Sequence, residues 1–201
     1  DGNIDEKRVK AMGGDVAFSV GSNNYEIGKA AAQYLKGQTG KVLIIEGASS
    51  SQNGLFRAQG FRENVDKGLT IVASQAADWD RLKAADITNR VITQYPDLAV
   101  VFAANDTMAL GAVEALRARG ISSVKVIGID GTVDAVKSIK EGRLTASVAQ
   151  LPYLMAKEAI QKTETYLKDH QPVSFRQYVP SLTLDKAVFE MNTDPLLQYV
   201  R

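Results

Sequence analysis

The sequence predicts an α/β fold in which helices cover both faces of a doubly wound parallel sheet. Short apolar runs rich in β-branched residues alternate with longer segments of helical periodicity, an order typical of parallel strands joined by right-handed crossovers. Residues 41–46, Lys-Val-Leu-Ile-Ile-Glu, are apolar almost throughout, as expected for a strand covered on both faces. Gly68, Gly120 and Gly142 each follow a helical segment, where a C-terminal cap is expected.

The predicted strands are short runs of Val, Ile, Leu and Ala, each bounded by turn residues or by a helical segment. The last of them follows a polar connector at residues 171–177. In chain order, the predicted strands cover residues 16–20, 41–46, 69–74, 99–103, 124–129, 145–149 and 181–184.

The predicted helices carry apolar residues at spacings of three and four. In the first of them, Ile27, Ala31 and Leu35 share one face. Pro96 marks the exit of one helix, and Pro152 suits the first turn of another. In chain order, the predicted helices cover residues 24–36, 53–67, 80–95, 106–119, 133–141 and 152–168, and Asp194-Pro195 indicates a further helix start in the tail.

The composition excludes several classes of function. The 201 residues carry a formal net charge of +1, without the strong basic excess that nucleic-acid binders usually show. The chain has no cysteine, which excludes disulfide scaffolds, thiol catalysis and cysteine-based zinc sites. The single histidine, His170, cannot form a multi-histidine metal site. No metal and no cofactor is therefore expected.

Four polar or aromatic side chains follow predicted strands at the point where each strand ends. They are Trp79, Asn105, Asp130 and Gln150. In an open parallel sheet, ligands bind outside the carboxyl ends of the strands, so we expect these side chains to converge. Amide and carboxylate groups suit hydroxyls, and an aromatic face suits an apolar ring surface. The combination predicts a site for a polyhydroxylated, uncharged ligand.

These segments also carry a resemblance to a known family. In order along the chain, the motifs are Arg57-Ala-Gln-Gly-Phe61, Ala77-Asp-Trp-Asp-Arg81, Ala104-Asn-Asp-Thr-Met-Ala109, Gly128-Ile-Asp-Gly131 and Val148-Ala-Gln150. Together they resemble the ribose, allose and galactose branch of the type I periplasmic sugar-binding proteins, the solute receptors of ABC importers. The resemblance runs from Asp1 to about Leu184.

The resemblance implies a binding protein and not an enzyme. Its ligand would be a monosaccharide, a ribose-like or allose-like pentose or hexose, held between two lobes. A membrane permease of the ABC type would receive the sugar, and the protein would be periplasmic. The segment around Gly13-Gly14 and the Ala-Asp-Trp-Asp-Arg motif are more similar to the allose type than to the ribose type.

The resemblance also assigns roles to particular residues. Trp79 would stack on the sugar ring, although a half-buried tryptophan of the core or rim is the alternative. Arg57 would use its fixed fork of donors on adjacent hydroxyls, where a solvated helix arginine is the alternative. Asn105 would bind the ligand, and Asp106 would cap the helix or support the hinge; Asn and Asp are both preferred caps.

Three further positions complete the expected ligand set. Asp130 would accept charge-assisted hydrogen bonds from two hydroxyls, and a turn aspartate before Gly131 is the alternative. Gln150 would bind ligand at a lobe crossing, or else be a polar residue of a solvated connector. Asp1 could accept a bond from a sugar hydroxyl, although it is also the first residue of the chain.

The family pattern divides the chain into two lobes of unequal size. The crossings between lobes fall near residues 22–23, 150–151 and 180–181. One lobe would comprise residues 23–150 and 181–201, and the remainder of the other would comprise residues 1–22 and 151–180. The family's first lobe begins about 100 residues earlier, a typical domain's worth of chain. We therefore expect a separate or missing N-terminal segment to complete that lobe; the alternative is that the larger lobe functions alone.

Alternative classes of function remain open at this stage. The same fold serves as the ligand-sensing domain of membrane receptor kinases and as the effector core of LacI-type regulators, although no basic helix-turn-helix headpiece is present. The small-residue loop at residues 47–54 invites a phosphate-loop interpretation, but it lacks the Lys-Ser/Thr ending of that motif. An enzyme is disfavoured because a nucleophile–base pair is hard to assemble: the chain has no cysteine, and His170 lies in a polar connector.

Overall fold

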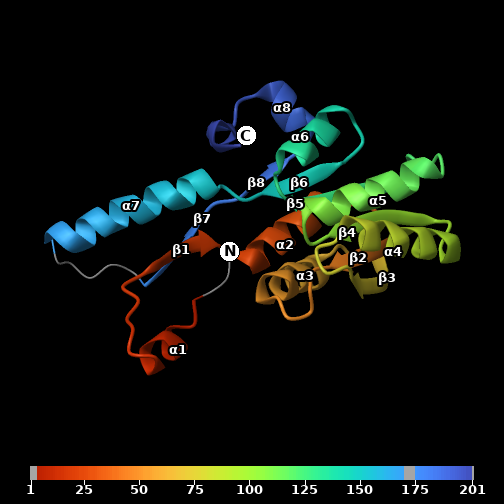
Figure 1. The fold of residues 1–201 in the computed structure, drawn as a ribbon. Helices are drawn as coiled ribbons and strands as arrows, with labels where there is room; N and C mark the ends of the chain where they lie inside the picture. Colours follow the sequence, from red (N-terminus) through yellow and green to blue (C-terminus); the bar gives the residue numbers. More distant parts are fainter. Residues whose placement is uncertain (1–3, 170–174, 201) are drawn as a thin grey trace.

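The computed structural model describes residues 4–169 and 175–200 of the chain (Figure 1). The strands are β1 Ser19–Ser22, β2 Gly40–Glu46, β3 Leu69–Ala76, β4 Leu98–Ala103, β5 Lys125–Asp130, β6 Ala146–Ala149, β7 Arg176–Val179 and β8 Leu182–Leu184. The helices are α1 Glu6–Ala11, α2 Asn24–Tyr34, α3 Gln52–Asn64, α4 Arg81–Gln94, α5 Asp106–Ala118, α6 Val133–Lys140, α7 Pro152–Asp169, α8 Lys186–Met191 and the 3-10 helix η1 Pro195–Tyr199.

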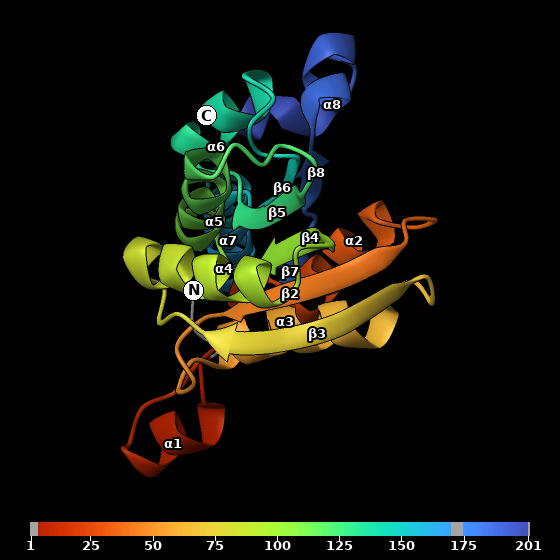
Figure 2. The ribbon, with the colours of Figure 1, turned by 90° about the vertical axis from the view of Figure 1, so that its right-hand side faces the viewer.

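A six-stranded sheet in the order β3-β2-β4-β5-β6-β8 forms the larger part of the molecule. Its first five strands are parallel, and only the edge strand β8 runs antiparallel, against β6. Helices α2 and α3 cover one face, whereas α4 and α5 cover the other (Figure 2). The fold class predicted from the sequence is confirmed, with the direction of β8 as the one departure from a parallel sheet.

The core has one apolar layer on each face of this sheet. Under α2 and α3, the rings of Phe61 and Phe102 stack with their centroids 4.2 Å apart. The opposite layer contains Met108 and Ile87 from the covering helices, packed with Leu43 of β2. Strands that are buried on both faces explain why residues 42–45 show no polar alternation.

Helices α2 and α3 touch through their backbones. A Cβ atom added at Gly28 would overlap the carbonyl oxygen of Arg57, and one added at Gly60 would overlap that of Tyr25. Only glycine therefore permits this approach at either position. The contact places the start of α2 directly beside the middle of α3.

A second, two-stranded sheet lies apart from the first. Strands β1 and β7 pair in parallel, with Ser19 opposite Arg176. Helix α7 packs beside them and extends away from the six-stranded sheet (Figure 1). The η1 helix returns to α7, where the rings of Tyr199 and Tyr153 lie 5.7 Å apart.

Several element boundaries differ from the sequence predictions. The first strand covers Ser19–Ser22 instead of residues 16–20, because it follows the register of its partner β7. Strand β7 enters the predicted polar connector of residues 171–177, of which residues 171–174 lie outside the described chain. Its residues alternate between exposed and covered, so it presents no apolar run. Helices α1 and α8 were not predicted, whereas η1 begins after Asp194 as expected.

No helix in the residues that the structure describes has both the length and the apolar composition of a membrane-crossing segment.

Candidate ligand-binding site

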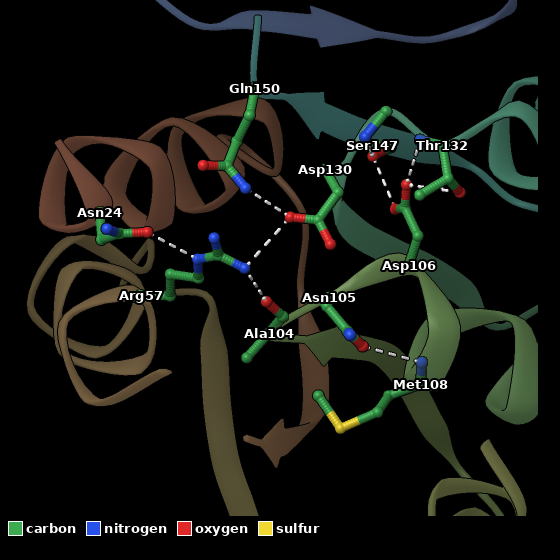
Figure 3. Close-up of polar contacts among 11 residues, drawn as sticks. Asn24, Arg57, Ala104, Asn105, Asp106, Met108, Asp130, Thr132, Ser147 and Gln150 are labelled. Carbon is green, nitrogen blue, oxygen red and sulfur yellow. Dashed lines mark hydrogen bonds and ion pairs between the residues drawn. The ribbon is translucent and has the colours of Figure 1, made fainter. Parts of the chain in front are cut away.

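The polar residues predicted from the sequence meet at one edge of the six-stranded sheet. Because β2, β4, β5 and β6 are parallel, their carboxyl ends lie at the same edge. Asp130 ends β5, Gln150 follows β6, and Asn105 follows β4 by two residues. Arg57 reaches the same place from α3 (Figure 3). The structure therefore brings together four residues that are far apart in the sequence.

Asp130 and Arg57 form the centre of the cluster. Arg57 Nη1 donates to Asp130 Oδ1 over 3.2 Å and to the carbonyl oxygen of Ala104 over 2.9 Å. Arg57 Nε donates to Asn24 Oδ1 over 2.8 Å. Gln150 Nε2 donates to the same Asp130 Oδ1 over 2.6 Å (Figure 3). A single carboxylate oxygen thus joins α3, β5 and the segment after β6.

The two charged groups differ in their access to solvent. The side chain of Arg57 is 4% exposed, whereas that of Asp130 is 27% exposed. Burial lowers the pKa of Arg57, and the Asp130 carboxylate acts in the opposite direction. Burial raises the pKa of Asp130, which Arg57 and Gln150 counteract. Among the described residues, Asp130 Oδ2 has no hydrogen-bond partner, so this oxygen is available to a ligand.

The backbone at this edge is unusual. Asp130 has a φ of 122° and Gly131 a φ of 72°, and a Cβ atom at Gly131 would overlap that of Ala149. Asp78 and Trp79 also have positive φ, at 53° and 65°. Side chains other than glycine adopt such values at a cost of about 1–3 kcal/mol each, and they do so mainly at functional sites. The strained positions flank the cluster around Asp130.

Trp79 lies on the loop between β3 and α4 and is half-buried. Its indole ring fills the space that side chains at Gly47 and Gly54 would occupy. The ring centroid lies 5.9 Å from Cζ of Arg57, within the range of a cation–π interaction. Trp79 is thus half-buried, as the alternative interpretation expected, and it also lies beside the cluster. Stacking of its ring on a sugar stays a prediction.

Asn105 and Asp106 have separate structural roles. Asn105 Oδ1 accepts from the backbone N–H of Met108 over 2.9 Å and caps α5. Asp106 is fully buried and accepts from the Thr132 N–H over 2.8 Å, the Thr132 hydroxyl over 3.1 Å and the Ser147 hydroxyl over 2.7 Å. Asp106 therefore supports the neighbouring loops and does not cap the helix. In the described chain, Asn105 Nδ2 has no partner and remains the group that a ligand could use.

Sequence reasoning missed several participants. Asn24 orients Arg57, and the Ala104 carbonyl accepts from it, yet neither has a sequence signal beyond its place after a strand. Thr132 and Ser147 likewise carry no motif of their own. Asp1 and His170 lie outside the described residues. Within the described ranges, no group of acidic or histidine side chains has an arrangement that could hold a metal ion.

A cavity of about 990 Å³ opens beside the cluster. Asp130, Thr132 and Gln150 are among its lining residues, whereas Arg57, Trp79 and Asn105 are not. Residues of the two-stranded sheet, of the segment before it and of α7 also line the cavity, among them Phe18, Tyr153 and Tyr178. The candidate site thus faces the space between the two sheets.

The larger sheet carries a polar cluster at its carboxyl edge, and this cluster faces a cavity beside a second sheet. Such an arrangement is typical of α/β proteins that bind a ligand. The chain belongs to the periplasmic binding protein family, whose domain model matches residues 4–171. Its fold is the type I periplasmic binding protein fold.

Known relatives agree with this assignment. The chain is 37% identical to the ribose import binding protein RbsB of Salmonella typhimurium, over 79% of this chain and 55% of that protein. It is 38% identical to the D-allose-binding periplasmic protein of Escherichia coli, over 75% of this chain and 52% of that protein. The chain therefore spans about half the length of the curated relatives it matches.

A solved structure gives the same result. A periplasmic solute-binding protein of an ABC transporter from Actinobacillus succinogenes, with bound D-allose, superposes with a TM-score of 0.82 at 32% identity. The match covers 95% of this chain and 69% of that protein. The resemblance stated from the sequence motifs is confirmed at the level of family and fold.

Proposed function

We propose that this chain carries the C-terminal sugar-binding lobe of a solute receptor, which binds a monosaccharide and delivers it to an ABC-type permease. The observation that carries the proposal is the Asp130 carboxylate: Arg57 and Gln150 hold one oxygen, the other has no partner among the described residues, and Asp130 lines the cavity. A carboxylate fixed in this way is an acceptor for sugar hydroxyls, and its bonds are charge-assisted.

The remaining predicted contacts suit the same ligand class. Asn105 would offer its free amide nitrogen to a hydroxyl oxygen. Trp79 would offer an aromatic face to the apolar C–H surface of the ring. Gln150 lies at the end of β6, where the chain passes from the larger sheet toward α7, so it would report the approach of the two lobes. Asp1 stays a predicted contact without a described position.

The proposed ligand is a ribose-like or allose-like pentose or hexose. Relatives named for ribose and for allose match the chain at similar identities, which supports a choice within this group. Residues 23–150 and 181–201 would form the binding lobe, and residues 1–22 and 151–180 would belong to the other lobe. A further N-terminal segment would complete that second lobe, consistent with the length of the relatives. The site would act by binding alone, in the periplasm, without a chemical step or a cofactor.

A fluorescence titration tests the proposal. Trp79 is the only tryptophan of the chain, so a saturable change in intrinsic emission reports on the loop beside Arg57. The titration would use ribose, allose, psicose, xylose, galactose and glucose, with calorimetry as a second method. We expect saturation with ribose or allose and a weaker response to glucose. A flat response to all six sugars by both methods would contradict the proposal.

A further inference from the structure

The loop that carries Asp130 has a conformation that its own residues do not favour. Asp130 and Gly131 both have positive φ, at 122° and 72°. An aspartate does not hold such a φ unless the surroundings over-determine it. The contacts that fix residues 130–132 therefore decide where the Asp130 carboxylate points.

Asp106 and Ser147 supply those contacts. Asp106 Oδ2 accepts from both the N–H and the hydroxyl of Thr132, over 2.8 and 3.1 Å. The Ser147 hydroxyl donates to Asp106 Oδ1 over 2.7 Å and accepts from the N–H of Gly131 over 3.1 Å (Figure 3). The two backbone N–H groups that follow Asp130 are both bound by this pair of side chains.

The space for this network is built into the sheet. Asp106 and Ser147 are both 0% exposed. A Cβ atom at Gly128 would overlap Asp106 Oδ1, so the glycine in β5 makes room for the carboxylate. The network joins the start of α5, the loop after β5 and the middle of β6. A buried carboxylate is costly, and three donors offset part of that cost here.

We propose that Asp106 is a positioning residue for the candidate site: together with Ser147 it holds residues 130–132 so that Asp130 faces Arg57 and Gln150. This proposal rests on the proposed sugar-binding function for its effect on affinity. Asp106 itself need not touch the ligand. Asp106 acts through the loop that it holds, because Asp130 in that loop contacts Arg57.

The test compares three variants with a matched control. Asp106→Asn keeps an acceptor for Thr132 and a polar group for Ser147, whereas Asp106→Ala removes both. Ser147→Ala deletes one fully buried hydroxyl inside the network. Thr88→Val deletes a fully buried hydroxyl elsewhere, which bonds only within α4 to the Ala84 carbonyl. The measurements are sugar affinity and amide hydrogen exchange at Gly131 and Thr132, with urea unfolding as a check on the fold.

We expect Asp106→Ala and Ser147→Ala to weaken sugar binding and to speed exchange at Gly131 and Thr132, each by about tenfold or more. Asp106→Asn should stay within about threefold of the wild type in both measurements, because its amide retains the main contacts. Thr88→Val should leave both measurements unchanged, because its hydroxyl bonds within α4 and lies outside the network. Ser147→Ala keeps the test decisive even if Asp106→Ala fails to fold.

Unchanged exchange at Gly131 and Thr132 in Ser147→Ala would overturn the proposal. Equal changes in Thr88→Val would also overturn it, because they would indicate general loosening. If the wild-type chain binds no sugar, the proposed function fails instead, and the exchange rates alone then decide the positioning role.

Discussion

At the scale of single residues, Arg57 shows how one buried cation organises several backbone segments. Its guanidinium binds a side chain of α2, a carbonyl after β4 and a carboxylate at the end of β5. A buried guanidinium is stable only if such partners replace water. The motif around Arg57 predicted a ligand contact, but the sequence could not show that most of its donors are used within the protein.

Removing this cation should destabilise the fold. Arg57→Ala leaves Asp130 without its main compensating charge, so we expect a loss of about 3–5 kcal/mol in the free energy of unfolding. Urea denaturation measures this loss. Arg62→Ala, on the same helix but partly exposed, should change stability by less than about 1 kcal/mol. Equal losses in the two variants would contradict the central role of Arg57.

Removing the charge of Asp130 should instead affect the ligand. Asp130→Asn keeps the shape of the side chain and an acceptor for Arg57, but its bonds to sugar hydroxyls would lose their ionic component. We expect affinity to fall by about 1.5–3 kcal/mol, measured by calorimetry with the best sugar of the panel. An unchanged affinity would show that Asp130 is not a ligand contact.

Because Asp106 is buried, we expect the stability of the folded chain to depend on pH. Burial raises its pKa from 3.8 to about 7, against the opposing effect of the Ser147 and Thr132 donors. Between these two values the folded chain keeps a proton that the unfolded chain has released. The free energy of unfolding therefore falls as pH rises through this window, by up to about 4 kcal/mol from this group.

Urea unfolding of the wild type and Asp106→Asn between pH 4 and 8 measures that dependence. The difference between the two curves cancels the titration of groups that do not interact with Asp106, and it retains the coupling of Asp106 to Asp130. We expect the wild type to lose stability relative to Asp106→Asn as pH rises. A difference that stays constant with pH would contradict a raised pKa for Asp106.

At the scale of elements, the strands and helices of the larger sheet were predictable because each is buried on a regular pattern. Strands β2, β4 and β5 are apolar on both faces, and the helices α2 to α6 begin and end near cap or glycine signals. The elements that sequence reasoning missed or shifted lie in the second sheet, in α1 before it and in the C-terminal part of the chain. There β7 alternates between exposed and covered residues, and β1 depends on a partner about 150 residues away.

The same contrast holds for the candidate site. Strand ends predicted that Asn105, Asp130 and Gln150 would meet, because parallel strands share one edge. The sequence could not decide which of Asn105 and Asp106 caps α5, since both residue types serve as caps. Only the fold placed Thr132 and Ser147 around Asp106, because one hydroxyl comes from the loop after β5 and the other from β6.

The loop after β2 and the loop after β3 should be coupled through Trp79. A side chain at Gly47 would overlap the indole ring, so Gly47→Ala should displace Trp79 and shift its emission maximum. We expect a loss of about 1–3 kcal/mol in stability, typical of overpacking. Gly21→Ala is the control, because nothing lies near its Cβ position. Identical spectra for Gly47→Ala and the wild type would contradict the packing described for Trp79.

At the scale of the whole molecule, the two sheets differ in how completely helices bury them. No residue of α7 between Pro152 and Lys168 is buried, and Ile160 remains 63% exposed. Few apolar contacts and exposed backbone hydrogen bonds mark regions that open at low free energy. We expect amides of β1 and β7 to exchange at least about tenfold faster than those of β4 and β5. Equal protection of the two sheets, measured by NMR, would contradict this ranking.

The glycine contact between α2 and α3 has a mechanical consequence. Where two helices meet through side chains, rotamer changes at the contact reduce how much a displacement of one helix moves the other. Here the backbones of α2 and α3 are in contact at Gly28 and Gly60, so we expect the two helices to move as one rigid unit. Strand β1 is connected to this unit by a very short segment, since α2 begins two residues after Ser22. A rotation of the smaller sheet would therefore be transmitted through Asn24 to the Arg57 guanidinium with little loss of amplitude.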